Sequence, residues 1–86
     1  MRIKKVIIEE GTQEKILRKH NVKVTEIEEV LLQSSLVLKS KWGRYTAIGY
    51  HQRYLTIVFE YNEGVVEIIT AYPSSEKQIK YLKNKQ

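Results

Sequence analysis

Polar and hydrophobic residues alternate along most of the second half of the chain, which is the pattern of strands with one buried face. Turn residues interrupt this alternation and divide it into four predicted strands, over residues 36–39, 44–50, 53–61 and 65–72. Near the start of the chain, an apolar run within residues 3–9 predicts one more strand. The pattern therefore predicts a sheet built mainly from the second half of the chain.

The run Asn62-Glu63-Gly64 is typical of a hairpin loop between the last two strands. A three-residue loop with Gly64 in the left-handed conformation would place Tyr54 near Tyr72, whereas a two-residue loop would pair Arg53 with Tyr72. The sequence leaves both registers open.

Two helices are expected between the first strand and the others. Thr12 can cap a short helix over residues 13–20, and Asn21 suits the left-handed residue that ends it. The run Thr25-Glu26-Ile27-Glu28 has the spacing of a capping box and opens a second helix, which ends at residues 33–35. The apolar residues at helical spacing in this second helix are Ile27, Val30 and Leu31.

A third helix is expected after Pro73, which ends the last strand. Ser74 or Ser75 can cap this helix, which spans residues 76–83 and is amphipathic and basic.

The 86 residues fit one domain, residues 1–86. The predicted fold class is α+β: a small antiparallel sheet with an N-terminal strand, two helices before the sheet, and one C-terminal basic helix. We expect the helices to pack mainly on one face and to leave the other face for a ligand or partner.

Composition excludes several kinds of chemistry. The chain has no cysteine, which excludes disulfides, thiolate catalysis and cysteine-ligated metals. It also has no aspartate, which excludes a Ser-His-Asp triad and removes the usual ligand of magnesium-dependent nucleases. The two histidines, His20 and His51, have no partner at metal-ligand spacing. We therefore expect neither a metal site nor a cofactor.

Charge points to a polyanionic partner. The chain carries 15 Lys and Arg residues against ten acidic residues, a net charge of +5. Residues 73–86 hold four lysines and one glutamate and supply +3 of that charge. Basic domains are attracted to phosphate-rich partners, most often nucleic acid. No apolar run is long enough for a membrane span or a signal peptide, so we expect a cytoplasmic protein without a membrane partner.

Aromatic residues are concentrated from Trp42 onward and are interleaved with Arg44, Arg53 and the terminal lysines. This mixture suits RNA, because unstacked bases pack on aromatic rings while cations hold the phosphates. The same tyrosines also suit ordinary packing on a sheet. Arg44 and Arg53 bracket one predicted hairpin, so we expect them to point at the same anion.

Four segments together resemble the BrnT family of bacterial and archaeal toxins: Lys19-His20-Asn21-Val22, Arg44-Tyr45-x-Ala47-Ile48-Gly49, Arg53-x-Leu55-x-Ile57-Val58-Phe59 and Ile68-Ile69-Thr70-Ala71. The similarity covers about residues 16–75 in the right order. It implies a RelE-like fold and a metal-independent endoribonuclease that cleaves mRNA as the toxin of a type II toxin–antitoxin system. It also implies a cognate antitoxin, which neutralises the toxin and binds operator DNA together with it.

The resemblance places His20, Arg44 and Arg53 on matching positions, and Tyr72 stands where the family has arginine. We expect the two arginines to be phosphate and transition-state cations, and His20 and Tyr72 to transfer protons or stack on bases. The expected RNA-binding residues are Lys77, Lys80, Tyr81 and His51.

Other positions depart from the family pattern. Glu9-Glu10 replaces its Trp-Asp, while Gln78 and Leu82 replace the glutamate and tyrosine of its last helix. These departures favour an alternative, a non-catalytic RNA- or protein-binding module on the same fold. A third possibility is a protein-interaction element whose sheet edge or basic helix binds an acidic segment.

Overall fold

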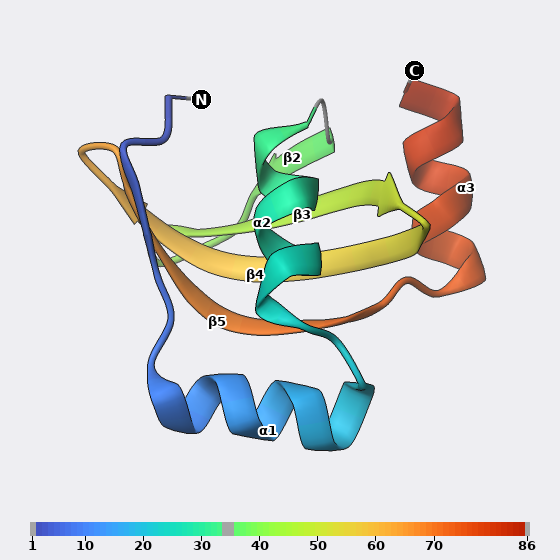
Figure 1. Cartoon of the computed structure of the whole chain (residues 1–86). Coiled ribbons are helices and arrows are strands. Elements are labelled where there is room, and N and C mark those ends of the chain that lie inside the picture. Colours follow the sequence, from blue (N-terminus) through green and yellow to red (C-terminus); the bar gives the residue numbers. More distant parts are fainter. Residues whose placement is uncertain (1, 34–35, 86) are drawn as a thin grey trace.

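The computed structural model describes residues 2–33 and 36–85, which form a five-stranded sheet with three helices (Figure 1). This is the predicted α+β class. Its elements are β1 (Lys5–Ile7), α1 (Glu10–His20), α2 (Val24–Leu32), β2 (Leu36–Lys39), β3 (Arg44–His51), β4 (Arg53–Asn62), β5 (Val65–Pro73) and α3 (Glu76–Lys85). In Figure 1, α1 lies below the strands, α2 crosses in front of them, and α3 stands at one end.

The sheet has the strand order β1-β5-β4-β3-β2. Strands β2 to β5 form the predicted antiparallel meander, but β1 pairs with β5 in parallel, so the sheet is mixed. The reason is the position at which β1 begins. The backbone N–H groups of Lys4 and Lys5 donate to the carbonyl of Gly64 at 2.7 and 3.2 Å, so β1 starts at the end of the sheet where β5 also starts.

The two faces of the sheet are covered by different helices. The main core includes Leu55 and Ile57 of β4 and is covered by α1 and α2. Ile48 pairs with Thr56, which lies between those two residues and therefore points to the opposite face. Ile48 of β3 and Leu82 of α3 are both buried outside the main core, and α3 contacts β3. The expectation that the helices share one face therefore holds for α1 and α2, whereas α3 covers part of the other face.

The β4–β5 hairpin follows neither of the two predicted registers. Its loop has two residues, Glu63 and Gly64, with φ of 48° and 87°, as a type I′ turn requires. A register shift follows, because Ile69 is left without a partner in β4. Tyr72 consequently lies opposite Thr56 rather than Tyr54 or Arg53.

The first two helices begin earlier than predicted. Glu9 is the N-cap of α1, so Thr12 lies inside the helix rather than capping it. Lys23 is the N-cap of α2, and Glu26 is the third helical residue, whose carboxylate accepts a hydrogen bond from the Lys23 N–H at 3.1 Å. The predicted capping box with Thr25 is therefore wrong, although Glu26 does close the helix start.

The other predicted helix ends agree better with the structure. Asn21 has φ of 54° and ends α1 in the left-handed conformation, as predicted. At the start of α3, the Ser75 hydroxyl accepts a hydrogen bond from the Gln78 N–H at 3.2 Å. Ser75 is therefore the cap, and α3 continues to Lys85. The predicted end of the second helix includes residues 34–35, which lie outside the described residues.

The turn between β4 and β5 gives a stability prediction. A methyl group on Gly64 would meet the Lys4 side chain at 2.8 Å and would be held at φ +87°. We expect Gly64→Ala to lower the free energy of unfolding by about 1–2 kcal/mol. Gly11→Ala is the matched control, because the site lies in α1 with nothing within 4 Å and should gain about 0.5–1 kcal/mol. Urea unfolding of both variants measures this, and equal effects would contradict the account.

Candidate active site

The structure brings together two of the predicted catalytic residues, His20 and Tyr72. His20 is the last residue of α1, and Tyr72 lies near the end of β5. Their ring centroids are 6.0 Å apart, with an angle of 54° between the planes. Both side chains are half-buried, so each is held by the fold while part of it faces solvent. A general acid and a general base at this separation can act on one substrate group.

The Tyr72 hydroxyl is positioned by a polar network under the start of α3. The Gln78 side-chain amide donates to this hydroxyl at 3.2 Å. The Gln78 side-chain oxygen accepts from the fully buried Thr56 hydroxyl at 3.0 Å and from the Ser75 N–H at 2.9 Å. Thr56 also shares a hydrogen bond of 2.7 Å with the Ser74 hydroxyl. Because the phenol accepts the Gln78 hydrogen bond, its own proton stays available for donation to a substrate.

A cavity of about 300 Å³ lies beside His20, between α1 and β5. Its lining contains two lysines, one histidine and two hydroxyl groups, with no carboxylate. The lining residues are Thr12, Lys15, Ile16, Lys19, His20, Ile69 and Thr70. This composition suits an anion, because each polar side chain in the lining can donate a hydrogen bond.

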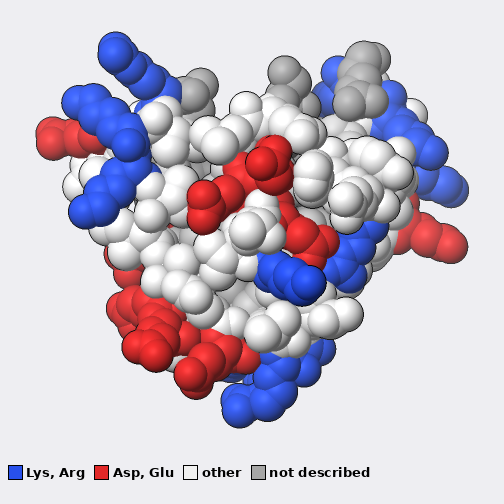
Figure 2. Space-filling view, in the orientation of Figure 1, with Lys and Arg blue, Asp and Glu red and all other residues white. Residues whose placement is uncertain are grey.

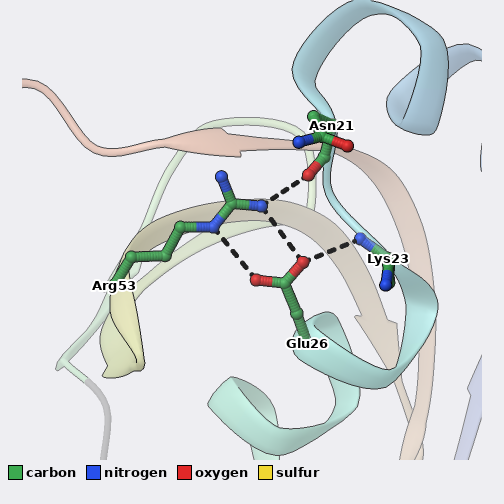
Figure 3. Close-up of polar contacts among 4 residues, drawn as sticks. All are labelled: Asn21, Lys23, Glu26 and Arg53. Carbon is green, nitrogen blue, oxygen red and sulfur yellow. Dashed lines mark hydrogen bonds and ion pairs between the residues drawn. The ribbon is translucent and has the colours of Figure 1, made fainter.

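Arg53 lies in a different environment from the one predicted for it. Its Nε and Nη2 donate to the two carboxylate oxygens of Glu26, each at 3.0 Å (Figure 3). The same Nη2 also donates to the backbone carbonyl of Asn21 at 2.5 Å. Arg53 thus joins β4 to the first turn of α2 and to the residue that follows His20. We call this group the Arg53 clamp.

Arg44 lies at the other end of β3 and pairs with Glu60 across the hairpin, with a nitrogen–oxygen distance of 3.7 Å. Both side chains are about half exposed. Since β3 contains eight residues, its two ends are roughly 23 Å apart. The prediction that Arg44 and Arg53 point at one anion is therefore wrong: they bracket the hairpin in sequence but lie at its opposite ends.

The predicted RNA-binding residues of α3 are on the surface. Lys77 and Lys80 are exposed, and the Lys85 ammonium lies 5.5 Å from the centroid of the Tyr81 ring. Figure 2 shows basic side chains gathered over α3 and acidic ones over α2. A second aromatic and basic group lies next to α3. Tyr50 and Tyr54 are in edge contact, with ring centroids 4.9 Å apart, and the Lys83 ammonium lies 5.8 Å from the centroid of the Tyr54 ring.

His51, the fourth predicted RNA-binding residue, lies on the tip of the β3–β4 hairpin and is half-buried. Its Nδ1 is 3.4 Å from the Gln33 side-chain amide nitrogen. The structure thus distributes the predicted site residues over four places: His20 with Tyr72, the end of the β3–β4 hairpin with His51 and Arg53, its other end with Arg44, and α3.

Two residues that the sequence reasoning missed, Lys15 and Lys19, line the cavity beside His20. Their spacing of four residues on a predicted helix, directly before His20, is the signal that identifies them.

The described residues contain no group of three or more potential metal-ligating side chains. Each of the described helices is too short or too polar to span a membrane.

Comparisons with known proteins find similarity at the level of structure. No protein-family model matches the sequence, and no curated protein has a similar sequence. Among solved structures, the crystal structure of the ribonuclease toxin BrnT of Brucella abortus matches with a TM-score of 0.69 and 22% sequence identity. The match covers 84% of this chain and 97% of that one. The chain has the BrnT fold. The resemblance found in the sequence is thereby confirmed for the architecture.

The Arg53 clamp also makes the stability of the BrnT fold in this chain depend on pH. The hydrogen bonds from Arg53, assisted by the Lys23 N–H and opposed by partial burial, hold the pKa of the Glu26 carboxyl below its ordinary value of 4.5. A carboxyl with a lowered pKa stabilises the fold above its unfolded-state pKa, and this stabilisation is lost as the pH falls through the folded-state value.

We therefore expect Glu26→Gln to cost about 1 kcal/mol of unfolding free energy near neutral pH. The difference from wild type should shrink as the pH falls below 4.5. Urea unfolding across a pH series measures it, with the exposed Glu29→Gln on the same helix as the control. A difference that stays constant or grows towards acid pH would contradict the assignment.

Proposed function

We propose that this chain is the toxin of a type II toxin–antitoxin system and acts as a metal-independent endoribonuclease on mRNA. The observation that carries the proposal is the His20–Tyr72 pair beside a cation-lined cavity, on the fold of a ribonuclease toxin. A net charge of +5 adds long-range attraction for RNA.

The proposed reaction uses the RNA as its own nucleophile. The His20 imidazole removes the proton of a ribose 2′-hydroxyl, whose oxygen forms a bond to the adjacent phosphorus. The bond from phosphorus to the 5′-oxygen breaks, and Tyr72 gives its hydroxyl proton to that leaving oxygen. The products are a 2′,3′-cyclic phosphate and a 5′-hydroxyl. Proton exchange with water returns both side chains to their starting states.

The arginines have different roles in this proposal. Arg53 acts as a positioning residue, because its clamp fixes the carbonyl of Asn21 and with it the orientation of the neighbouring His20. Arg44 pairs with Glu60 of β4, whereas Tyr72 pairs with Thr56 of the same strand. Glu60 and Thr56 are four residues apart, so Arg44 lies roughly 13 Å along the sheet from Tyr72. It would therefore contact RNA outside the cleaved linkage.

The exposed residues around α3 would hold the flanking RNA. Cations of α3 suit the phosphates, and the Tyr81 ring suits a stacked base. In this proposal His51 contacts RNA at the hairpin tip, while Lys77 and Lys80 do so from α3. The toxin acts in the cytoplasm, where its cognate antitoxin neutralises it and the two together bind operator DNA.

Induced expression in a host cell tests the proposal. Growth should stop, and mapping of mRNA 5′ ends should show new cleavage sites that disappear in the His20→Ala variant. Co-expression of a small protein encoded next to the gene should restore growth. Normal growth with no new ends, from protein that is soluble and folded, would overturn the ribonuclease proposal.

A second function, RNA binding without cleavage, is favoured by one observation. Arg44 and Arg53 are both engaged in ion pairs, so neither is free to stabilise a transition state without giving up its partner. This alternative predicts salt-dependent RNA binding by the wild type, with the RNA left intact. Gel analysis of the bound RNA distinguishes the two functions.

A further inference from the structure

We infer that the cavity between α1 and β5 binds a phosphate of single-stranded RNA through Lys15 and Lys19, next to His20. The inference rests on the proposed function and deepens it, since it assigns to these two lysines the role that the sequence suggested for Arg44 and Arg53.

The helix geometry brings the two lysines to one place. Residues four apart lie on the same face of a helix, so Lys15 and Lys19 form one row along α1. Ile16, beside Lys15, is 2% exposed and anchors this part of α1 against the sheet. His20 follows Lys19 directly and lines the same cavity, so a phosphate held by the two ammonium groups lies within reach of the imidazole.

Two threonines add residues that can donate hydrogen bonds to the lining of the cavity. Thr12 belongs to α1, like the two lysines, and Thr70 lies across from them on β5. Tyr72 lies two residues after Thr70 on the same strand and contacts His20 from that side. Successive strand residues alternate in direction, so Thr70 and Tyr72 share one face of β5. The proposed proton-transfer pair therefore adjoins the cavity through His20, which belongs to both.

Charge favours this cavity over the larger hollow of the molecule. The ion pairs found among residues 2–33 and 36–85 involve Arg44 and Arg53, and within that part of the chain neither Lys15 nor Lys19 is paired with a carboxylate. A hollow of about 630 Å³ at the β4–β5 turn is lined by Glu60, Glu63 and Glu67 and would repel RNA. Figure 2 shows basic side chains below one half of α1 and acidic ones over its other half.

The size of the cavity limits the ligand. About 300 Å³ is at the lower end of the range for small-molecule sites, which suits one nucleotide unit and not a folded RNA element. The site therefore belongs to single-stranded RNA, whose backbone can enter one nucleotide at a time.

Salt-dependent binding of a single-stranded, 2′-O-methylated RNA tests the inference, because the methyl groups prevent attack by the 2′-oxygen. We compare wild type with Lys15→Gln/Lys19→Gln. The matched control is Lys39→Gln/Lys41→Gln, which removes the same charge from exposed positions in and after β2. Loss of the one phosphate held by these two lysines should reduce the slope of log K against log salt by about 0.7 for the cavity variant. The control should keep the wild-type slope.

Amide chemical shifts provide a second readout. Inorganic phosphate should shift the backbone amides of residues 12–20 and 69–72 in wild type, and these shifts should be absent in Lys15→Gln/Lys19→Gln. Equal slopes for the two double variants, or phosphate shifts located elsewhere, would overturn the inference. A reduced slope with phosphate shifts at the cavity, together with no cleavage of ordinary RNA by wild type, would leave the phosphate site standing and refute only the ribonuclease proposal.

Discussion

Replacing His20 by Ala or Tyr72 by Phe should slow single-turnover RNA cleavage by about 10²–10⁴-fold, the usual contribution of a positioned general base or acid. Tyr72→Phe removes only the hydroxyl and keeps the ring that packs against His20. The affinity for uncleavable RNA should change little, because neither substitution removes a cation that holds phosphate. The effect should therefore lie in the chemical step.

Tyr61→Phe is the matched control for the tyrosine variant. The Tyr61 hydroxyl donates to the backbone carbonyl of Arg2 at 2.6 Å, on the edge of the sheet where β1 lies. The Tyr61 variant therefore also loses one hydrogen bond, but away from His20. We expect the Tyr61 variant to cleave at the wild-type rate when folded. Cleavage by Tyr72→Phe at the rate of this control would show that Tyr72 does not donate the proton.

Removing the Arg53 side chain should have the second large effect. Arg53→Ala leaves the Glu26 carboxylate, whose side chain is 17% exposed, without its charged donor. It also removes the hydrogen bond to the Asn21 carbonyl. We expect a loss of about 2 kcal/mol in unfolding free energy, reduced from the cost for a fully buried pair because Arg53 is itself partly in contact with solvent. Arg44→Ala is the control, and its pair with Glu60 is half exposed and should cost less than about 1 kcal/mol.

The activity of a Glu26 variant separates the two possible roles of Arg53. If Arg53 positions His20 through the clamp, then Glu26→Gln loosens the same clamp and should lower the cleavage rate in the same direction as Arg53→Ala. If Arg53 instead holds phosphate, then Glu26→Gln frees the guanidinium and should strengthen RNA binding. Stronger RNA binding by Glu26→Gln would contradict the positioning role.

The sequence predicted most of the secondary structure because polar and hydrophobic residues alternate along the strands and turn-forming residues separate them. Its errors concern features without a local signal. Glu9 caps α1 with its backbone alone, so the sequence favoured Thr12, which is a better capping residue. The register of the β4–β5 hairpin depends on the extra residue Ile69, and the adjacent Ile68 and Ile69 look like continuous strand.

The site was harder to predict because its contacts join distant parts of the chain. His20 and Tyr72 are brought together by the packing of α1 on β5, which periodicity does not specify. Glu26 was interpreted as a capping residue, although it also pairs with Arg53, 27 positions later. Arg44 and Arg53 are nine positions apart and are the first residues of β3 and β4. Because these two strands run antiparallel, their first residues lie at opposite ends of the hairpin.

The measurement that tests the central claim most directly is cleavage of a defined RNA by the purified protein in the presence of EDTA, with identification of the new ends. Attack by the 2′-hydroxyl, with His20 and Tyr72 moving the protons, predicts fragments that carry 2′,3′-cyclic phosphates and 5′-hydroxyls. It also predicts that chelation leaves the rate unchanged. Intact RNA, or fragments with 5′-phosphates whose formation stops in EDTA, would contradict it.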